Sequence, residues 1–328
     1  MTEPASGEAL LGRGSRAGLS RVVGILGPTG VGKTAVASWV ARMLETRVIS
    51  CDSMQIYSGF PVLTNQPTEE ETLGVEHALV GFLDPTASFS AAAYAELARP
   101  LIDEDLRTKG AAVLAGGTGL YLRAALAPLA VAPHDDETRA ILEARAAAGE
   151  GPDLYRELVR LDPQAAASID PRNLRRVVRA LEVVLCGQKW SGRSDLWEPE
   201  YQYPTIVFGL TARRSELYRR LDIRTRKMLM SGAVEEVRRF RERYGSQETA
   251  PGLPGIRSAI GYREIWRFLE GELTLEEAVT CVSAATRHYA RRQLTWLRKV
   301  KGAVIIELPD VNPEAAAKKL IALASEAG

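Results

Sequence analysis

The chain has 328 residues, of which 46% are apolar and 25% charged, and its formal net charge at pH 7 is +1. This composition is typical of a globular protein with a large core, and no apolar run approaches the roughly 20 residues of a membrane-spanning helix. The three cysteines, Cys51, Cys186 and Cys281, form no CxxC pair and no Cys/His cluster, so neither a disulfide framework nor zinc is indicated. We therefore expect a cytoplasmic protein without zinc.

The first feature along the chain is a phosphate-binding motif. Residues 1–20 are rich in Gly, Ala and Ser and lack an apolar signal core, so we expect a disordered tail. The run Val22–Leu26 then predicts a strand, and the pattern from Ala35 to Leu44 predicts a helix. Between them lie Gly27, Pro28, Thr29, Gly30, Val31, Gly32, Lys33 and Thr34.

These eight residues predict a loop that holds a phosphate chain. Glycines let successive backbone N–H groups face an anion, and the helix that follows adds the positive end of its dipole. In nucleotide-handling loops of this type, the lysine contacts the terminal phosphates and the threonine hydroxyl binds magnesium. Lys33 and Thr34 occupy those two positions.

The rest of the chain alternates strand and helix patterns. Five further apolar runs occur, at Val48–Ser50, Ala78–Phe82, Ala111–Ala115, Thr205–Leu210 and Val304–Leu308. This alternation predicts an α/β fold with a P-loop NTPase-like parallel sheet flanked by helices. Strand candidates are absent from residues 127–203, which predicts an inserted all-helical domain. The core would comprise residues 21–126 and 204–310, followed by a C-terminal helix at 311–328.

Asp52 is the carboxylate expected nearest to the loop, because it follows the run Val48–Ser50. A phosphoryl-transfer enzyme places an acidic residue at the end of a second strand to bind magnesium. The run Ala111–Ala115 instead leads into a glycine turn at 116–119 without a carboxylate. Asp52 is therefore the leading candidate for a general base, although a helix cap, a turn residue and a magnesium ligand stay open as alternatives.

Two segments far from the loop concentrate positive charge. One is the predicted helix Asn173–Leu185, whose apolar residues recur at helical spacing and whose one acid is Glu182; the other spans residues 286–301 and has no acid. Their basic residues are Arg172, Arg175, Arg176 and Arg179, and Arg287, Arg291, Arg292, Arg298, Lys299 and Lys301. A solvated charged face explains either segment alone. Combined with a phosphate loop, the two segments favour a polyanionic acceptor such as RNA.

Eight motifs give the chain a resemblance to the bacterial type of tRNA dimethylallyltransferase, or tRNA isopentenyltransferase, of the IPP transferase family. They extend from about Arg21 to Lys301, and their order and spacing make the resemblance specific. The motifs are GPTGVGKT at 27–34, SCDSMQIY at 50–57, FSAAAY at 89–94, AGGTGLY at 115–121, RRVVRALEV at 175–183, RKMLMSGAVEEV at 226–237, AIGYRE at 259–264 and ATRHYARRQLTWLRK at 285–299.

The resemblance implies that a dimethylallyl group moves from dimethylallyl diphosphate, with Mg2+, to the exocyclic amine of a tRNA adenosine. That adenosine would be adenosine 37, next to the anticodon, in tRNAs reading codons that begin with U; N6-dimethylallyladenosine and diphosphate would be the products. Asp52 would be the general base, with Thr29 and Arg224 as further catalytic residues. The diphosphate would be held by residues 27–34 together with Arg220 and Arg224, and Thr34 would bind magnesium.

The resemblance also implies contacts with the anticodon stem-loop from several parts of the chain. The residues are Asp52, Ser53, Met54, Gln55, Thr118, Arg139, Arg175, Arg176, Arg179, Ser258, Gly261, Tyr262, Arg263, Arg291, Arg292, Gln293 and Arg298. Trp296 is assigned to the core, because a tryptophan flanked by two leucines is more often core than a stacking platform. His77, His134 and His288 have no metal-ligand spacing. We expect no zinc finger of the kind that eukaryotic relatives carry, and we expect a monomer.

Three other functions stay open on the sequence alone. An adenylate isopentenyltransferase shares the loop and the donor but prenylates free AMP, ADP or ATP. A small-molecule kinase would use Asp52 as a magnesium ligand and transfer a γ-phosphate. An RNA-binding module would retain the loop only as part of the fold. The loop motif by itself predicts nucleotide or ATP binding, yet we expect turnover to need no ATP.

Overall fold

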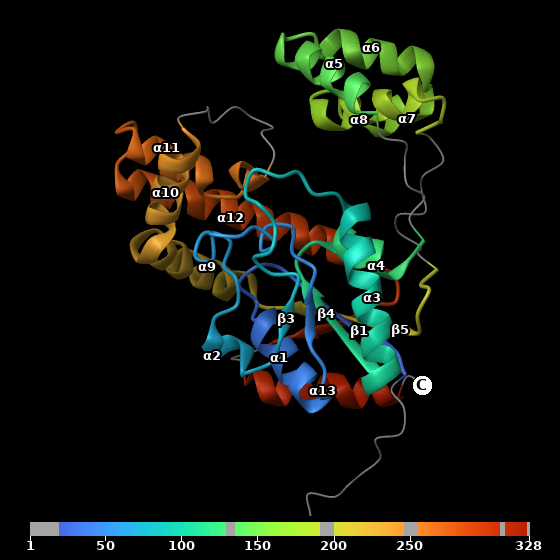
Figure 1. The fold of residues 1–328 in the computed structure, drawn as a ribbon, viewed down its shortest axis with the longest axis vertical. Coiled ribbons are helices and arrows are strands. Elements are labelled where there is room, and N and C mark those ends of the chain that lie inside the picture. Colours follow the sequence, from blue (N-terminus) through green and yellow to red (C-terminus); the bar gives the residue numbers. More distant parts are fainter. Residues whose placement is uncertain (1–19, 129–134, 191–199, 246–254, 309–311, 327–328) are drawn as a thin grey trace, which may run out of the picture. The chain divides into compact units, whose positions relative to one another are not determined.

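The computed structural model describes residues 20–128, 135–190, 200–245, 255–308 and 312–326. The predicted disordered tail, apart from Ser20, and His134 lie outside these residues. The chain divides into two compact units, residues 1–126 with 201–328 and residues 127–200, whose elements are labelled in Figure 1. Within the described ranges, no helix is long and apolar enough to cross a membrane.

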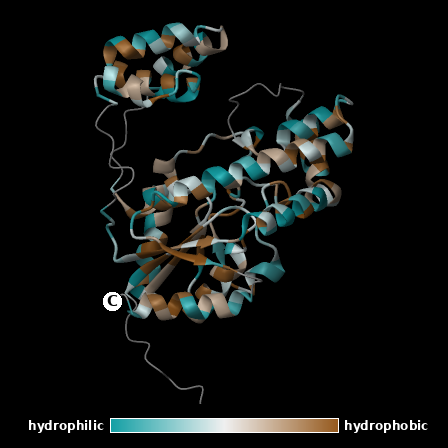
Figure 2. Ribbon diagram, turned by 180° about the vertical axis from the view of Figure 1, so that it is seen from behind, coloured by the Kyte–Doolittle hydropathy of each residue, from teal (hydrophilic) through white to brown (hydrophobic). Residues whose placement is uncertain are grey.

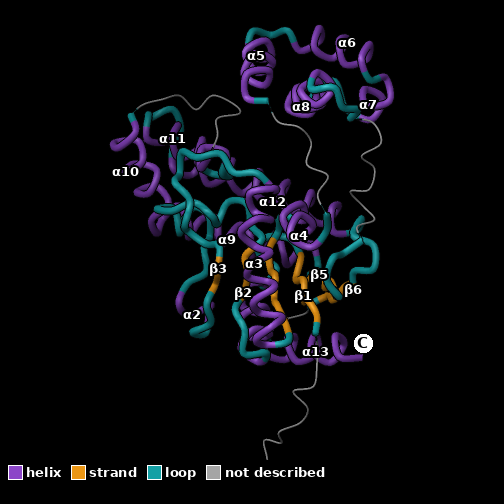
Figure 3. Tube along the Cα trace, turned by 45° about the vertical axis from the view of Figure 1, so that its right-hand side comes forward, coloured by secondary structure: helices purple, strands orange, loops and turns teal. Residues whose placement is uncertain are grey.

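The larger unit is built on a six-stranded parallel sheet, shown in orange in Figure 3. Its order is β3-β2-β4-β1-β5-β6, and every neighbouring pair is parallel. The strands are β1 (Arg21–Leu26), β2 (Val48–Ser50), β3 (His77–Ala78), β4 (Ala111–Gly116), β5 (Thr205–Thr211) and β6 (Val304–Glu307). The predicted α/β fold with a parallel sheet is therefore confirmed.

One strand prediction is too long. The run Ala78–Phe82 is apolar throughout, but the strand ends at Ala78. Leu79 and Gly81 both have a φ of 62°, in the left-handed region that interrupts an extended chain. The remainder of this run is therefore a loop beside the sheet.

Helices cover both faces of the sheet, because successive strand residues point to opposite sides. Val23 and Ile25 pack in one core with residues of α1, α9 and α13, whereas Val22 and Leu26 pack in the other with residues of α3 and α4. Figure 2 shows the strands as the most continuously apolar part of the chain, as expected for a sheet buried on both faces. These helices are α1 (Lys33–Met43), α3 (Ala91–Lys109), α4 (Gly119–Leu126), α9 (Arg214–Met228) and α13 (Pro313–Glu326).

A helical layer with its own core extends the larger unit beyond the sheet. It contains η2 (Leu229–Ala233), a π-helical turn that follows α9, together with α10 (Val234–Tyr244), η3 (Gly255–Ser258), α11 (Tyr262–Leu269) and part of α12 (Leu275–Leu297). The short helix α2 (Glu69–Thr72) is not part of this layer. Helix α12 contributes to three cores: Val282 lies in the core of this layer, and Ala290 and Leu297 lie in the two cores at the sheet. It therefore connects the layer with the edge of the sheet.

In the smaller unit, the residues that the structure describes form four helices around a separate core. They are α5 (Asp136–Ala147), α6 (Gly151–Leu161), α7 (Pro163–Ser168) and α8 (Leu174–Leu185), and the core includes Leu142, Leu158 and Leu181. Helix α8 begins after Asn173, whose Oδ1 accepts from the backbone N–H of Arg176 at 3.3 Å. No strand is found among the residues of this unit that the structure describes.

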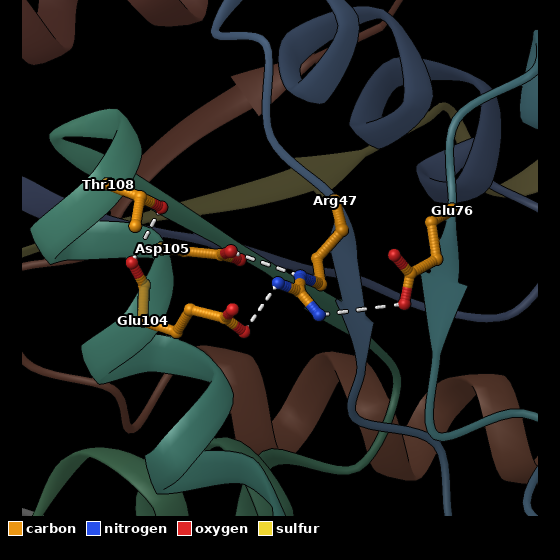
Figure 4. Close-up of polar contacts among 5 residues, drawn as sticks. All are labelled: Arg47, Glu76, Glu104, Asp105 and Thr108. Atoms are coloured by element: carbon orange, nitrogen blue, oxygen red, sulfur yellow. Dashed lines mark hydrogen bonds and ion pairs between the residues drawn. The ribbon is translucent and has the colours of Figure 1, made fainter.

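An ion cluster joins the starts of β2 and β3 to the end of α3 (Figure 4). Nε of Arg47 donates to Oδ1 of Asp105 at 3.0 Å, and Nη2 donates to Oε2 of Glu104 at 2.7 Å. Glu76 completes the cluster, 3.6 Å from Nη1. The Asp105 side chain is only 2% exposed, and burial raises its pKa. Arg47 is thus the main cationic partner of a buried carboxylate, at the end of β2 opposite to Asp52.

Replacement of Arg47 by Ala is expected to lower the free energy of unfolding by about 2–4 kcal/mol, because the buried Asp105 loses its cation. Glu76→Ala removes an exposed partner from the same cluster and should cost less than about 1 kcal/mol. Urea denaturation of the two variants compares these effects directly. Similar small losses for both would show that Asp105 does not depend on Arg47.

Candidate active site

The loop, Asp52 and the second glycine turn meet at one edge of the sheet. In the parallel register, Leu26 of β1 pairs with Gly116 of β4, and Ser50 of β2 pairs with Ala115. The three strands therefore end side by side, where ligands of open α/β sheets bind. The segments that follow them are adjacent in space although they are far apart in the sequence.

Close packing forces the shape of the phosphate loop. A Cβ at Gly27 would lie 2.5 Å from the carbonyl oxygen of Leu210, which is closer than atoms can approach. Gly32 has a φ of 99° and is the residue from which α1 begins. The glycines of the motif are thus required by backbone approach and by left-handed geometry, and the first turn of α1 is presented to the loop.

Lys33 is folded into this loop. Its Nζ donates to the carbonyl of Pro28 at 3.0 Å. Burial lowers the pKa of Lys33 to about 8, although the nearby Asp52 carboxylate opposes this shift; Arg224 lowers the pKa further. The ammonium group therefore lies in a poorly solvated position where an added anion would interact with it strongly.

Arg224 reaches the loop from α9. Its Nη2 donates to Oγ1 of Thr29, and burial lowers its pKa, an effect that Asp52 and Glu71 oppose. The structure thus brings together Thr29, Lys33, Arg224 and Asp52, as the sequence predicts. Arg220 lies one turn earlier on α9 and donates from Nε to Oε1 of Glu216 at 2.8 Å, so part of its guanidinium is engaged on its own helix.

Asp52 has one structural oxygen and one open oxygen. Its Oδ1 accepts from the backbone N–H of Met54 at 2.9 Å, which fixes the turn after β2. Its Oδ2 has no hydrogen-bond partner among the described residues, and lies 3.7 Å from the position of a Cβ on Gly117. The turn residue and the candidate base are therefore the same carboxylate, used at different atoms.

Thr118 anchors the second glycine turn to the segment that carries Asp52. The Thr118 backbone N–H donates to the carbonyl of Cys51 at 3.2 Å, and its Oγ1 accepts from the N–H of Ser53 at 3.2 Å. A Cβ at Gly116 would lie 2.3 Å from the same carbonyl. The two turns are therefore held in direct contact.

Two residues of α12 complete the site. Gln293 bonds to both glycine segments, through the N–H of Thr29 at 2.8 Å and the carbonyl of Gly117 at 3.0 Å. Tyr289, one turn earlier, interacts through its hydroxyl with Thr118 and Gln293, and burial raises its pKa. Sequence reasoning missed Tyr289 and gave Gln293 a different role. Their spacing of four residues within one predicted helix was the available signal.

Two residues that follow Asp52 have different surroundings. Met54 Sδ lies 3.9 Å from Oγ of Ser258, so the structure brings together two residues predicted to contact tRNA. The side chain of Gln55 is used within the protein instead. Its Nε2 donates to the carbonyl of Asn65 at 2.6 Å, and its Oε1 accepts from Oγ of Ser50 at 3.2 Å.

The motif at 259–264 is divided between core and surface. Tyr262 is 1% exposed and lies edge-on to Phe240 with ring centroids 5.9 Å apart, so the structure does not bring its side chain to the surface. Gly261 is also buried, and it begins α11 with a φ of 97°. Arg263 is exposed. Of these three predicted contacts, Arg263 alone presents its side chain to solvent.

Three basic residues at the end of α12 are exposed, whereas Arg287, farther back on the helix, is partly buried and pairs with Asp222. Arg291, Arg292 and Arg298 are solvent-exposed, and the guanidinium of Arg292 lies 5.6 Å from the ring centroid of Tyr289. Trp296 packs with the core at the sheet and fills the space where Gly119 has no side chain. This packing agrees with the structural role predicted for Trp296.

The arginines of the smaller unit are of two kinds. Arg179 and Arg139 lie 2.7 and 3.7 Å from Oε2 of Glu182, a fully buried carboxylate. Arg175 and Arg176 are exposed and make no ion pair with any described residue. The interpretation of the basic segment 172–179 as lacking acidic partners is therefore wrong for Arg179, which pairs with the inward-pointing Glu182, and for Arg172, which lies 3.0 Å from Oδ2 of Asp170.

His77 lies behind the helix that follows the loop. Oγ of Ser38 donates to the carbonyl of Thr34 at 2.9 Å, so its oxygen accepts from Nε2 of His77 at 3.0 Å. Burial lowers the pKa of His77 from 6.5 to about 4. The neutral imidazole thus connects β3 with the first turn of α1.

The protein is expected to lose stability between pH 6.5 and pH 4 because of His77. The unfolded chain takes up a proton at this residue below pH 6.5, whereas the folded chain does so only below about pH 4. Protonation therefore favours unfolding in this window, by on the order of 1–2 kcal/mol after allowance for partial exposure. His77→Gln keeps a donor for Ser38 and should flatten the pH dependence of the urea midpoint; parallel curves for variant and wild type would contradict this account.

A parallel sheet that ends in a lysine-containing phosphate loop defines a protein of the P-loop α/β class. The family model of IPP transferase matches residues 55–300. The tRNA dimethylallyltransferase of Thermomicrobium roseum is 44% identical over 284 residues, covering 85% of this chain and 84% of that protein; the one of Anaeromyxobacter dehalogenans is 42% identical over 306 residues, covering 92% and 99%.

Solved structures give the same result. The full-length tRNA isopentenylpyrophosphate transferase of Bacillus halodurans has a TM-score of 0.65 at 36% identity, covering 94% of this chain and 95% of that one. A eukaryotic dimethylallyltransferase described as acting on tRNA has a TM-score of 0.79 at 26% identity, covering 93% and 78%. The chain therefore belongs to the IPP transferase family of enzymes, the tRNA dimethylallyltransferases, which confirms the resemblance seen in its motifs.

Proposed function

We propose that this chain transfers a dimethylallyl group from dimethylallyl diphosphate to the exocyclic amine of adenosine 37, next to the anticodon, in tRNAs that read codons beginning with U. One observation carries the proposal. Two partly buried cations, Lys33 and Arg224, lie at the same edge of the sheet as the open carboxylate oxygen of Asp52. A leaving diphosphate needs the cations, and an amine that becomes alkylated needs the base.

The proposed step forms a C–N bond, breaks a C–O bond and transfers one proton from nitrogen to oxygen. The amine nitrogen of adenine attacks the allylic carbon, the C–O bond to the diphosphate breaks, and its electron pair leaves with the diphosphate. Oδ2 of Asp52 accepts the proton that the nitrogen loses. Lys33 and Arg224 stabilise the charge that develops on the leaving group, and Thr29, held by Arg224, orients it.

Magnesium fits this site as a companion of the diphosphate. Among the described residues, no group of three or more His, Cys, Asp or Glu side chains is arranged to hold a metal ion. The Thr34 hydroxyl, in the first turn of α1, has no hydrogen-bond partner among those residues and is the ligand that we propose. Mg2+ commonly binds through phosphate oxygens with few protein ligands, and it would supply further charge neutralisation of the diphosphate.

An RNA acceptor is supported by the exposed arginines. Arg175 and Arg176 on α8, and Arg291 and Arg298 at the end of α12, are solvent-exposed and make no ion pair with a described residue. Such side chains bind backbone phosphates without sequence preference. Ser53, Met54 and Thr118, beside Asp52, and Ser258, beside Met54, remain proposed contacts for the extruded base and its neighbours, as does the exposed Arg263. For Arg139 and Arg179 the proposed tRNA contact has to compete with Glu182.

The choice of acceptor tests the proposal against its rivals. Purified protein with Mg2+ and radiolabelled dimethylallyl diphosphate is offered an anticodon stem-loop, AMP or ATP in separate reactions. The proposal expects label in the stem-loop alone. Label in AMP or ATP would assign the adenylate-type reaction instead, and transfer of the labelled γ-phosphoryl group of ATP to a small acceptor would support a kinase.

A further inference from the structure

Gln293 lies where the loop for the diphosphate and the second glycine turn meet. Its Oε1 accepts from the backbone N–H of Thr29 at 2.8 Å, and its Nε2 donates to the carbonyl of Gly117 at 3.0 Å. The residue is 7% exposed. Both ends of its amide are therefore engaged within the protein, which leaves little of the side chain to contact RNA.

The approach of α12 to the second turn is unusually close. A Cβ at Gly117 would lie 2.0 Å from Nε2 of Gln293, and a Cβ at Gly119 would lie 1.7 Å from the ring of Trp296. A side chain at Gly119 would require the Trp296 ring to move, and one at Gly117 would displace the amide of Gln293 from its present position. The helix thus lies directly against the turn, and Gln293 crosses from it to the loop.

We infer that Gln293 is a positioning residue that fixes the distance between the diphosphate loop and the turn beside Asp52, an inference that rests on the proposed function. The donor is held on one of these segments, and the base lies against the other. An alkyl transfer requires the nucleophile, the allylic carbon and the base to be aligned, and a misplacement of about 1 Å costs on the order of 100-fold in rate. A single amide bonded to both segments is a direct means of holding that alignment.

This role differs from a contact with tRNA in its kinetic consequences. A residue that binds RNA lowers the affinity for the stem-loop when it is removed and leaves the rate of the bound complex nearly unchanged. Removal of a positioning residue lowers the transfer rate of the bound complex and leaves the affinity for the stem-loop nearly unchanged. Exposed Arg291, two residues earlier on α12, serves as the contrasting RNA-binding position.

The first test compares Gln293→Met, Arg291→Ala and Thr295→Ala in single-turnover transfer to a stem-loop. Methionine matches glutamine in length and lacks both hydrogen-bonding groups. We expect Gln293→Met to lower the transfer rate of the bound complex by about 10–100-fold, with a Kd for the stem-loop within about twofold of wild type. Arg291→Ala should weaken binding of the stem-loop. Thr295→Ala, at an exposed position, should change neither the rate nor the Kd. A weaker Kd with an unchanged rate for Gln293→Met would overturn the inference.

A second test uses the glycine that faces Gln293. Gly117→Ala places a Cβ against Nε2 of Gln293 and should slow transfer, whereas the same change in a Gln293→Ala background meets no such atom. We therefore expect the two substitutions to be strongly non-additive, with the double variant no slower than Gln293→Ala alone. Additive losses would show that Gln293 does not set the position of this turn.

A third measurement does not depend on the transferase activity. The affinity for inorganic diphosphate with Mg2+ is measured by calorimetry for wild type and Gln293→Met. Because the backbone N–H of Thr29 loses its hydrogen bond to Gln293, we expect the affinity for diphosphate to decrease by about 3–10-fold, which corresponds to the loss of about one hydrogen bond. An unchanged affinity for diphosphate in Gln293→Met would contradict the inference even if the enzyme is active. If the wild type transfers the group to no acceptor, the proposed function is refuted, but the comparison of diphosphate affinities still tests the role of Gln293 in the loop.

Discussion

Asp52→Asn is expected to lower the rate of dimethylallyl transfer in the bound complex by about 10²–10⁴-fold, the usual contribution of a positioned general base. Asparagine keeps an oxygen that accepts from the N–H of Met54, so the turn after β2 is preserved. It replaces Oδ2 with an amide that cannot take up the proton. Single-turnover transfer at saturating donor and stem-loop measures the loss.

The Asp52 prediction is distinguished from a metal-binding role by magnesium titration. A base that is lost is not restored by more Mg2+, whereas a lost magnesium ligand raises the Mg2+ concentration needed for half-maximal rate. We also expect the Kd for the stem-loop to remain close to that of wild type. A rate within threefold of wild type would show that the proton goes elsewhere, and recovery at high Mg2+ would assign Asp52 to the metal.

Lys33→Met is expected to reduce kcat/KM for dimethylallyl diphosphate by about 10²–10³-fold, as does loss of a donor aimed at developing negative charge. The ammonium group is folded into the loop and only partly exposed, and methionine keeps its length without its charge. Exposed Lys227, at the end of α9, provides a matched control, and Lys227→Met should leave kcat/KM within twofold.

The pH dependence of diphosphate binding provides an independent test of the role of Lys33. In the free enzyme the pKa of Lys33 is lowered to about 8, chiefly by burial. Diphosphate favours the charged form, so binding takes up a proton when the pH exceeds this pKa. Affinity for inorganic diphosphate should therefore fall as the pH rises above about 8 in the wild type. The same slope in Lys33→Met would show that another group is responsible.

The sequence predicts well whatever depends on local geometry. The glycines at 27, 30 and 32 and the apolar runs around them are sufficient to place a strand, a loop and a helix in order. Five strands coincide with the apolar runs, and β3 overlaps its run at Ala78. Asp52 follows from the same logic, because parallel strands deliver their ends to one edge. In these segments, short-range backbone requirements and the tertiary structure agree.

Predictions that needed a specific partner were less successful. The bond between Thr29 and Gln293 joins residues 264 positions apart, and no property of either residue indicates it. Tyr262 sits in a motif that implies tRNA contact, yet helix packing turns its ring into the core. Glu182 reads as one acid in a basic face, but it points inward and pairs with Arg179. In each case the orientation of a helix, rather than its existence, decides the contact.

The most direct measurement of the central claim maps where the dimethylallyl group is placed. Two anticodon stem-loops are compared in single-turnover reactions with radiolabelled dimethylallyl diphosphate: one carries adenosine next to the anticodon, and the other carries purine ribonucleoside, which lacks the exocyclic amine, at that position. The account predicts label in the first RNA, on N6 of that adenosine, and none in the second, although both bind with similar Kd. Equal labelling of the two RNAs, or label at another nucleotide, would contradict it.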